Sequence, residues 1–258
     1  MQNITHEIAN LLGCPMELIP AAAGGSAIYR RYQMLQRQGQ GSFTPVVIYP
    51  TKQLLESMQR NLAAANAENC VEYARALLPV AQAIDPLQLL QQRMNALVQT
   101  LESVEKLLGE FLPTRHANEK NRLCQSCRNH ARNGVFIAQC PTQNSWELPL
   151  YVPMGGDGLC PVPVEQAAVM QFWHQQYQAV PVVAGYDIWE LRVAQSPTQV
   201  FEAERLALQQ FAFAPDLVRQ AHREDSDTIR ALASQLQGKK AWYFYWHSCG
   251  EQALGSNS

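Results

Sequence analysis

The last hundred or so residues alternate between helical patterns and short β-branched or aromatic runs, and this alternation limits the fold more than any other feature. The runs Val180–Ala184 and Ile188–Val193 flank Gly185, a pattern typical of a β-hairpin. Residues 164–178 before the hairpin carry apolar side chains at helical spacing, and so do residues 200–211 after it. The segment therefore predicts helices packed against a sheet.

A run of aromatic residues near the end of the chain predicts one more strand. In Ala241–Trp246, tryptophan and phenylalanine alternate with tyrosine, which favours a central strand that is buried on both faces. An aromatic platform for a ligand is the alternative reading. The β-branched run Val46–Tyr49, closed by Pro50, predicts a further buried strand. We therefore expect an α/β (α+β) fold with a mixed sheet flanked by helices.

A heptad-like stripe between the two halves of the chain predicts a long amphipathic helix. From Leu87 to Phe111 the apolar residues follow one another in steps of three and four. Asp85 and Pro86 stand where a cap and a first helical residue belong. We expect a single helix whose stripe is buried within a monomer. A coiled-coil dimer seam is the alternative.

These patterns divide the chain into segments. The expected segments are an N-terminal α/β part (1–84), the long helix with a cysteine-containing basic loop (85–145), a C-terminal domain (146–250) and a tail (251–258). At 258 residues with 47% apolar composition, the chain is long enough to bury a sizeable core.

The charge balance limits the partners that the chain can have. Twenty basic and 22 acidic residues give a net charge of −2, which supplies no field for nucleic acid or for an anionic membrane surface. No apolar run approaches the roughly 20 residues that span a bilayer. The first residues lack the basic start and apolar centre of a signal peptide. We expect a cytoplasmic protein that binds neither nucleic acid nor membrane.

Seven cysteines, an odd number in a chain of this length, favour reduced thiols over a disulfide framework. Cys124 and Cys127 form a Cys-x-x-Cys pair that could bind one zinc ion together with His130 and Cys140. A redox pair or two cysteines without a special role remain open, and no other cofactor is expected. The remaining cysteines that we expect to be ordinary thiols include Cys14, Cys70 and Cys249.

A locally basic segment surrounds the Cys-x-x-Cys pair. Between Arg115 and Arg132, basic or potentially basic groups face only one acid, Glu119. Such an imbalance in a slightly acidic protein suits an acidic patch on a partner protein. Arg122 and Arg128, with Arg132, are the candidate contact residues. A merely solvated face is the alternative.

Three glycines within four positions mark a second candidate contact. The sequence Gly155-Gly156-Asp157-Gly158 predicts a loop that needs positive φ angles or a close backbone approach. A phosphate loop is excluded because the Lys-Ser/Thr ending is missing. A structural turn and a ligand loop both remain open, and Gly155, Gly156 and Asp157 are candidate partner-binding residues.

The C-terminal third also resembles a known family. The residues that carry the resemblance are Val152-Pro153-Met154-Gly155-Gly156, Cys160-Pro161, Phe172-Trp173 with Tyr177, Asp187 and Glu190, Ala207-Leu208-Gln209-Gln210, Phe213-Ala214-Pro215-Asp216 and Trp242-Tyr243-Phe244-Tyr245-Trp246. In this order they make residues 151–247 similar to the domain of unknown function 4253 family. The resemblance implies a fold and no reaction.

The chain departs from the pattern of that family at several positions. Members usually have Cys at the position of Ala214 and Asp at the position of His247, and often Trp-Asn in place of Asp157-Gly158. Any chemistry that depends on those positions is therefore lost here. Members look like small bacterial cytosolic proteins encoded beside toxin and secretion loci.

Together these observations favour a non-enzymatic, bacterial, cytosolic protein-binding protein, with a toxin-neutralising immunity protein as the specific hypothesis. The main alternative is a hydrolase or transferase that uses Asp187, Glu190 and Asp216, with His247, in one cleft. A regular strand would direct Asp187 and Glu190 to opposite faces, which counts against a shared site. A metal-stabilised adaptor is the third hypothesis.

Overall fold

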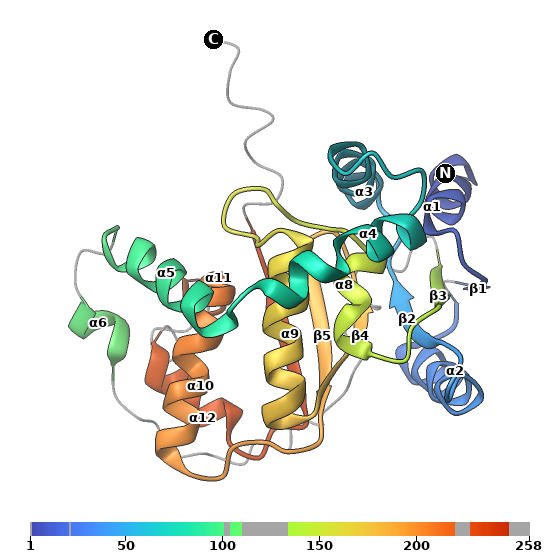
Figure 1. Cartoon of the computed structure of the whole chain (residues 1–258). Coiled ribbons are helices and arrows are strands. Elements are labelled where there is room, and N and C mark those ends of the chain that lie inside the picture. Colours follow the sequence, from blue (N-terminus) through green and yellow to red (C-terminus); the bar gives the residue numbers. More distant parts are fainter. Residues whose placement is uncertain (1, 21, 101–103, 110–133, 220–227, 248–258) are drawn as a thin grey trace.

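The computed structural model describes the chain except for residues 1, 21, 101–103, 110–133, 220–227 and 248–258 (Figure 1). Its helices are α1 (Gln2–Leu12), α2 (Gly25–Gln38), α3 (Lys52–Ala64), α4 (Cys70–Ala83), α5 (Pro86–Val98), α6 (Val104–Leu108), α8 (Leu148–Tyr151), α9 (Pro163–Tyr177), α10 (Val200–Phe213), α11 (Asp216–Arg219) and α12 (Ile229–Leu236), with a 3-10 turn η2 (Ser145–Glu147). Within these described ranges, no helix is both long enough and apolar enough to cross a bilayer.

One mixed sheet forms the centre of the fold. Its strands are β1 (Met16–Ile19), β2 (Thr44–Ile48), β3 (Val135–Cys140), β4 (Ala179–Ala184), β5 (Ile188–Val193) and β6 (Ala241–Tyr245). The spatial order is β1-β3-β2-β4-β5-β6. β2 and β4 run parallel, and the other neighbouring pairs run antiparallel. The predicted α/β class with a mixed sheet is confirmed, as is the hairpin of β4 and β5. The division of the chain into segments stays a prediction.

The helices cover the two faces of the sheet unequally. On one face, α2 packs Ile28, Tyr32 and Leu35 against strand residues such as Val47 and Val183. The opposite face carries the larger core, to which helices α1, α3, α4, α5, α8, α9, α10 and α12 contribute buried side chains. Figure 1 shows α9 running along this face, in front of β4 and β5.

Several helices begin where the sequence predicts. The Thr51 hydroxyl accepts a hydrogen bond from the Leu54 amide at the start of α3. At the start of α5, whose first residue is Pro86, the Asp85 carboxylate accepts hydrogen bonds from the amides of Leu87 and Gln88. Each cap satisfies amides that have no partner inside the helix and contributes about 1 kcal/mol.

The predicted central position of the aromatic strand is wrong, because β6 lies at the edge of the sheet and pairs with β5. Trp242 and Phe244 are buried, whereas Tyr243 on the other face is 44% exposed. The alternation of residue types therefore marks one buried face rather than two. Tyr245, on the same face as Tyr243, is half-buried, and its hydroxyl is hydrogen-bonded to His247 Nδ1 at 2.9 Å.

The predicted single helix from Leu87 to Phe111 is also wrong in its length. Helix α5 ends at Val98, α6 is a separate short helix, and Phe111 lies outside the described residues. The Thr100 hydroxyl donates a hydrogen bond to the Leu97 carbonyl, and the Thr100 amide contacts the same oxygen. This carbonyl is therefore taken by a tight turn instead of by the next helical amide, which ends the helix.

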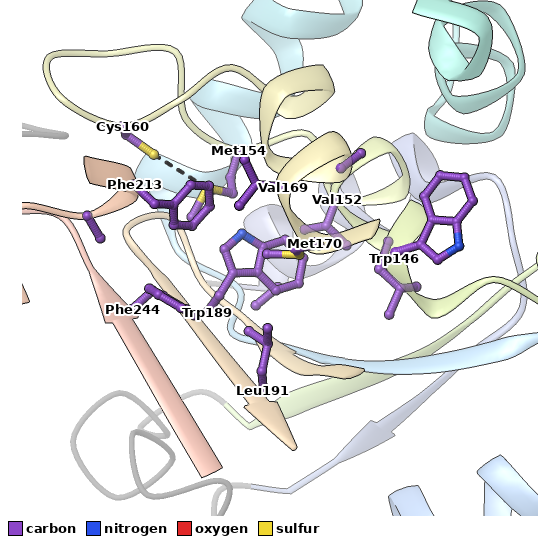
Figure 2. Close-up of a cluster of buried hydrophobic side chains, with 14 of the residues drawn as sticks. Trp146, Val152, Met154, Cys160, Val169, Met170, Trp189, Leu191, Phe213 and Phe244 are labelled. Atoms are coloured by element: carbon purple, nitrogen blue, oxygen red, sulfur yellow. Dashed lines mark hydrogen bonds between the residues drawn. The ribbon is translucent and has the colours of Figure 1, made fainter. Parts of the chain in front are cut away.

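An aromatic cluster joins the helical layer to the edge strand. Trp173 of α9 stacks on Phe244 at 5.2 Å between ring centroids, and both rings meet the edge of Phe213. Figure 2 shows Phe213 and Phe244 beside Met170 and Trp189 in the same core. Each favourable ring pair adds roughly 0.5–1.5 kcal/mol to area burial. The cluster thus holds β6 in place, although this edge strand pairs with a neighbouring strand on one side only.

Candidate functional site

Residues 153–161, which we call the glycine loop, run from the end of α8 to the start of α9. Gly155, Gly156 and Gly158 have φ angles of 88°, 85° and 55°, which confirms the predicted positive values. A Cβ at Gly155 would lie 2.6 Å from the Cys160 sulfur and equally close to the Pro161 carbonyl. Glycine is therefore required at position 155 both by its φ angle and by close packing.

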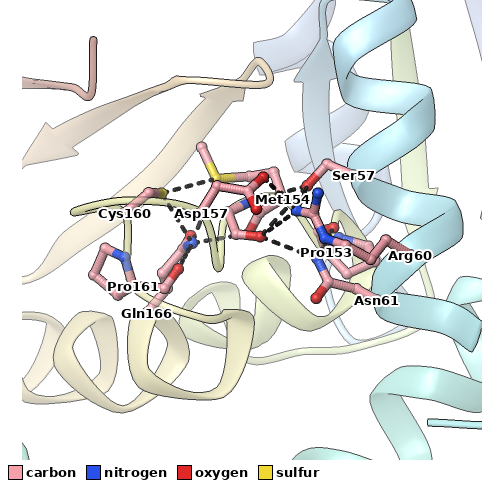
Figure 3. Close-up of polar contacts among 10 residues, drawn as sticks. Ser57, Arg60, Asn61, Pro153, Met154, Asp157, Cys160, Pro161 and Gln166 are labelled. Carbon is pink, nitrogen blue, oxygen red and sulfur yellow. Dashed lines mark hydrogen bonds and ion pairs between the residues drawn. The ribbon is translucent and has the colours of Figure 1, made fainter. Parts of the chain in front are cut away.

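Three side chains of α3 hold the glycine loop (Figure 3). The Ser57 hydroxyl accepts a hydrogen bond from the Gly155 amide at 3.1 Å, and Asn61 Nδ2 donates to the Pro153 carbonyl at 3.0 Å. Arg60 Nη2 donates to the Gly155 carbonyl at 3.0 Å. Backbone groups in a loop need such partners when they are buried. The loop conformation is thus set by a helix almost a hundred residues earlier in the sequence.

A buried glutamine holds the loop from the opposite side. Gln166 of α9 is 0% exposed. Its Nε2 donates to the carbonyls of Met154 at 2.9 Å and Pro161 at 2.7 Å, and its Oε1 accepts from Trp189 Nε1 of β5 at 2.7 Å. One side-chain amide therefore joins both ends of the loop, a helix and the sheet.

An arginine from α5 completes the framework of the loop. Arg93 Nη2 donates to the Leu159 carbonyl at 2.5 Å, and its Nε donates to the Ala212 carbonyl of α10 at 3.0 Å. Burial lowers the pKa of Arg93, although a guanidinium stays charged at physiological pH. The loop is thus held by α3, α5 and α9.

The apex of the loop faces solvent. Gly156 and Gly158 are exposed, and Asp157 pairs with Arg60 at 2.6 Å while both side chains remain about half exposed. The amides of Gly155 and Gly156 point inward, to Ser57 and to the carbonyls of residues 160 and 161. These amides cannot cradle an anion, so the geometry agrees with the sequence in excluding a phosphate loop.

Two of the three acids of the enzymatic hypothesis contact the same part of the chain. The Asp216 carboxylate accepts the His247 amide at 2.7 Å, and the neighbouring Trp246 amide donates to the Asp187 carbonyl at 3.0 Å. Asp187 and Asp216 therefore both contact the chain just after β6. Glu190 lies within β5 on the same face as Ile188, which packs on the α2 side. All three acids are buried, and the enzymatic alternative stays a hypothesis.

A pocket of about 350 Å³ lies between α4, the segment η2–α8 and the end of β3. Its polar lining residues are Arg75, Glu147 and Tyr151. The Glu147 carboxylate already accepts hydrogen bonds from Thr142 and Asn144. Burial, followed by the nearby Glu147 charge, raises the pKa of Tyr151 to about 12. Glu147 therefore holds the local structure together, and Tyr151 is a poor candidate for proton transfer near pH 7.

Most of the residues predicted for zinc and for the basic contact lie outside the described residues. These are Arg122, Arg128, Arg132, Cys124, Cys127 and His130. Cys140, the fourth predicted zinc ligand, is the buried last residue of β3 and belongs to the core against which Cys14 packs. Across the residues that the structure describes, no group of three or more His, Cys, Asp or Glu side chains is placed to hold a metal ion. The zinc site stays a prediction.

Some of the residues that build the loop framework were missed by sequence reasoning. Ser57, Arg60, Asn61 and Arg93 stand in ordinary amphipathic helices. Gln166 stands beside Glu165 near the start of a helix that contains further glutamines. A weak signal was available only for Gln166, because its position falls on the face of α9 that carries Met170 and Trp173.

The fold and the framework around the loop define an α/β domain with a glycine loop that is held by hydrogen bonds from three helices. Residues 136–247 match the family described as Domain of unknown function (DUF4253), which confirms the family resemblance of the C-terminal part. The match includes β3 from its second residue and all later elements, and it therefore begins before the range 151–247 that the sequence motifs indicated. No curated protein and no solved structure matches the chain.

Proposed function

We propose that this chain is a non-enzymatic, partner-binding protein of the bacterial cytosol, and that its specific role is to neutralise a toxin as an immunity protein. The observation that carries the proposal is the exposed apex of the glycine loop on a framework of three helices. A loop that is fixed before binding loses little conformational entropy when a partner docks, which favours affinity. Binding residues are disproportionately carried by such loops on rigid scaffolds.

The chemistry of the loop supports binding rather than catalysis. Gly156, Asp157 and Gly158 offer the partner an accessible backbone and an ion pair with Arg60. An exposed pair of this kind contributes at most about 1 kcal/mol to folding. It is therefore available to exchange partners at an interface. Val162, 38% exposed just beyond the loop, adds apolar surface.

The predicted basic segment complements this surface in the proposal. Arg122, Arg128 and Arg132 would meet an acidic patch on the toxin and accelerate association through long-range attraction. This contribution weakens as salt is added, because the Debye length falls from about 30 Å at 0.01 M to about 8 Å at physiological ionic strength. The zinc ion predicted beside these residues would act structurally, as a fixed knuckle that orients the arginines.

The direct test uses the product of the gene adjacent to the one that encodes this chain. The two proteins are co-expressed to measure rescue of growth, and their affinity is measured by calorimetry. Asp157→Trp places a large side chain at the apex of the loop, and we expect it to weaken binding at least tenfold, or about 1.4 kcal/mol. The control is Lys52→Glu, which alters an exposed ion pair elsewhere on α3 and should leave affinity unchanged.

A second variant tests the basic contact. The triple change Arg122→Glu, Arg128→Glu and Arg132→Glu should slow association at low salt while the circular dichroism spectrum stays that of the parent. Elemental analysis of both proteins shows whether a lost zinc ion accounts for the effect. Normal binding by both the loop variant and the triple variant would refute the placement of the contact. Absence of both binding and rescue would refute the immunity role.

A further inference from the structure

Three cysteines from distant parts of the chain meet beside the sheet. Cys14 follows α1, Cys70 is the first residue of α4, and Cys140 is the last residue of β3. All three are free thiols. All three side chains belong to the same core, and a Cβ at Gly13 would lie 3.0 Å from the Asn69 side chain, so the residues just before Cys14 and Cys70 are neighbours. This cluster is separate from the glycine loop and shares only Cys140 with the predicted zinc ligands.

The strand register places Cys14 opposite Cys140. β1 pairs with β3 through Met16 and Ala138, and two further steps along each strand lead to the two cysteines. The ladder continues past the end of β1, because the Gln139 amide donates to the Pro15 carbonyl at 2.8 Å. Residues 15 and 139 are thus the hydrogen-bonded pair, and the cysteines occupy the next non-hydrogen-bonded position.

That position suits a disulfide bond. Opposite residues in a non-hydrogen-bonded antiparallel pair have Cα atoms about 4.5 Å apart, within the range of roughly 4.4–6.8 Å that disulfides require. Successive residues of a strand alternate between faces, so Cys14 and Cys140 project to the same side as Met16 and Ala138. All four belong to the same core.

The two thiols differ in access. Cys14 is half-buried between the exposed residues Gly13 and Pro15, whereas Cys140 is 0% exposed. Redox-sensing cysteines are accessible to solvent and often lie next to a second cysteine that resolves the oxidised sulfur. Cys14 is therefore the thiol that an oxidant reaches first, and Cys140 is placed to resolve it.

We propose that Cys14 and Cys140 are a peroxide-sensitive thiol pair that closes to a reversible disulfide, independently of partner binding. The Cys14 sulfur attacks one oxygen of hydrogen peroxide, the O–O bond breaks, and the released hydroxide takes the thiol proton to become water. The resulting sulfenic acid is attacked by the Cys140 sulfur, an S–S bond forms, and the hydroxyl group leaves as water with the Cys140 proton. The sulfurs lose two electrons, and one peroxide becomes two waters.

The disulfide would lock the edge of the sheet. β1 is an edge strand that pairs with β3, so a bond between Cys14 and Cys140 fixes it covalently to its neighbour. Closing a chain loop of this length restricts the unfolded state and stabilises the fold. It would also remove Cys140 from any set of zinc ligands. Reducing thiols in the cytosol would reverse the bond.

The test follows oxidation of a variant in which Cys124, Cys127 and Cys249 are serine, so that those thiols cannot react. Treatment with hydrogen peroxide should lower the intact mass by about 2 Da, and proteolysis should yield a linked peptide that contains Cys14 and Cys140. A thiol reductant should restore the mass. The melting temperature should be higher in the oxidised form. Peptide mapping of the unsubstituted chain gives the same readout without the serine replacements.

Single variants identify the order of events. Cys140→Ser should stop at a Cys14 sulfenic acid that a dimedone reagent captures, and Cys14→Ser should abolish the mass loss. Cys70→Ser, the matched change within the same cluster, should still form the bond. A disulfide between Cys14 and Cys70, over-oxidation of Cys14 beside a free Cys140 thiol, or no reaction in the folded chain would each overturn the proposal.

Discussion

Replacing Gln166 with leucine tests whether the buried amide holds the glycine loop in place. The substitution keeps roughly the same volume but removes the hydrogen bonds to Met154, Pro161 and Trp189. The Pro161 carbonyl keeps the Gly156 amide as a partner, whereas the Met154 carbonyl and the Trp189 indole N–H lose the partners described above. A buried polar group without a partner costs about 1–3 kcal/mol. We therefore expect a loss of roughly 2–6 kcal/mol.

Urea denaturation followed by tryptophan fluorescence and circular dichroism measures this loss. The control is Gln175→Leu, which makes the same chemical change at an exposed position of the same helix and should stay within about 0.5 kcal/mol of the parent. A free energy of unfolding for Gln166→Leu within 1 kcal/mol of the control would refute the reasoning, because it would mean that the orphaned groups find water or other partners.

The isosteric variant Gln166→Glu separates hydrogen bonding from packing. A carboxyl group buried at this position has a raised pKa, since burial disfavours its charged form. While protonated it can donate to the Met154 carbonyl and accept from Trp189. Stability should therefore be nearest to the parent at acidic pH and should fall as pH rises toward 8. A deficit that does not change with pH would show that the site is open to solvent.

Other predictions follow from the core and from ionisable groups. Phe244→Ala, at a residue that is 0% exposed, should cost roughly 3–5 kcal/mol, and a melting temperature within a degree of the parent would contradict this. Leu97→Asp should destabilise the fold without changing the sedimentation mass, whereas conversion of a dimer into a stable monomer would reveal an intermolecular seam. Burial raises the pKa of both Tyr73 and Tyr151 to about 12. The stability that these neutral tyrosines contribute is present below about pH 10 and is lost as pH rises toward 12. Replacing either tyrosine with Phe should reduce the loss of unfolding free energy over this pH range, measured by denaturation.

Features that depend on neighbouring residues could be predicted from the sequence. The hairpin around Gly185, the cap at Asp85 and the positive φ angles near Gly155 all follow from local chemistry. The short strand β1 could not be predicted, because its four residues carry no clear alternation and it is a strand only by pairing with β3. The break after Val98 could not be predicted because the apolar spacing continues past it. Thr100, whose hydroxyl helps to form the turn, does not interrupt that spacing.

The sequence predicted the glycines of the loop but not the side chains that hold the loop in place. Glycine spacing alone indicated Gly155 as a special position, but Ser57 and Asn61 reach it from a helix that the sequence does not connect with it. The same limit applies to Cys14 and Cys140, which come opposite each other only when the pairing of β1 and β3 is extended by two residues. The spacing of apolar residues shows which face of a helix or strand is buried, but it does not show which other element packs against that face.

The strand order has a consequence for how the nascent chain matures. β1 and β2 lie on either side of β3, so both emerge from the ribosome long before the strand that joins them has been synthesised. The parallel contact of β2 with β4 requires a still later segment. Pairings that are so distant in sequence form slowly and leave strand edges open to other chains in the meantime. We therefore expect a chaperone-dependent interval that lasts until the hairpin of β4 and β5 has been made.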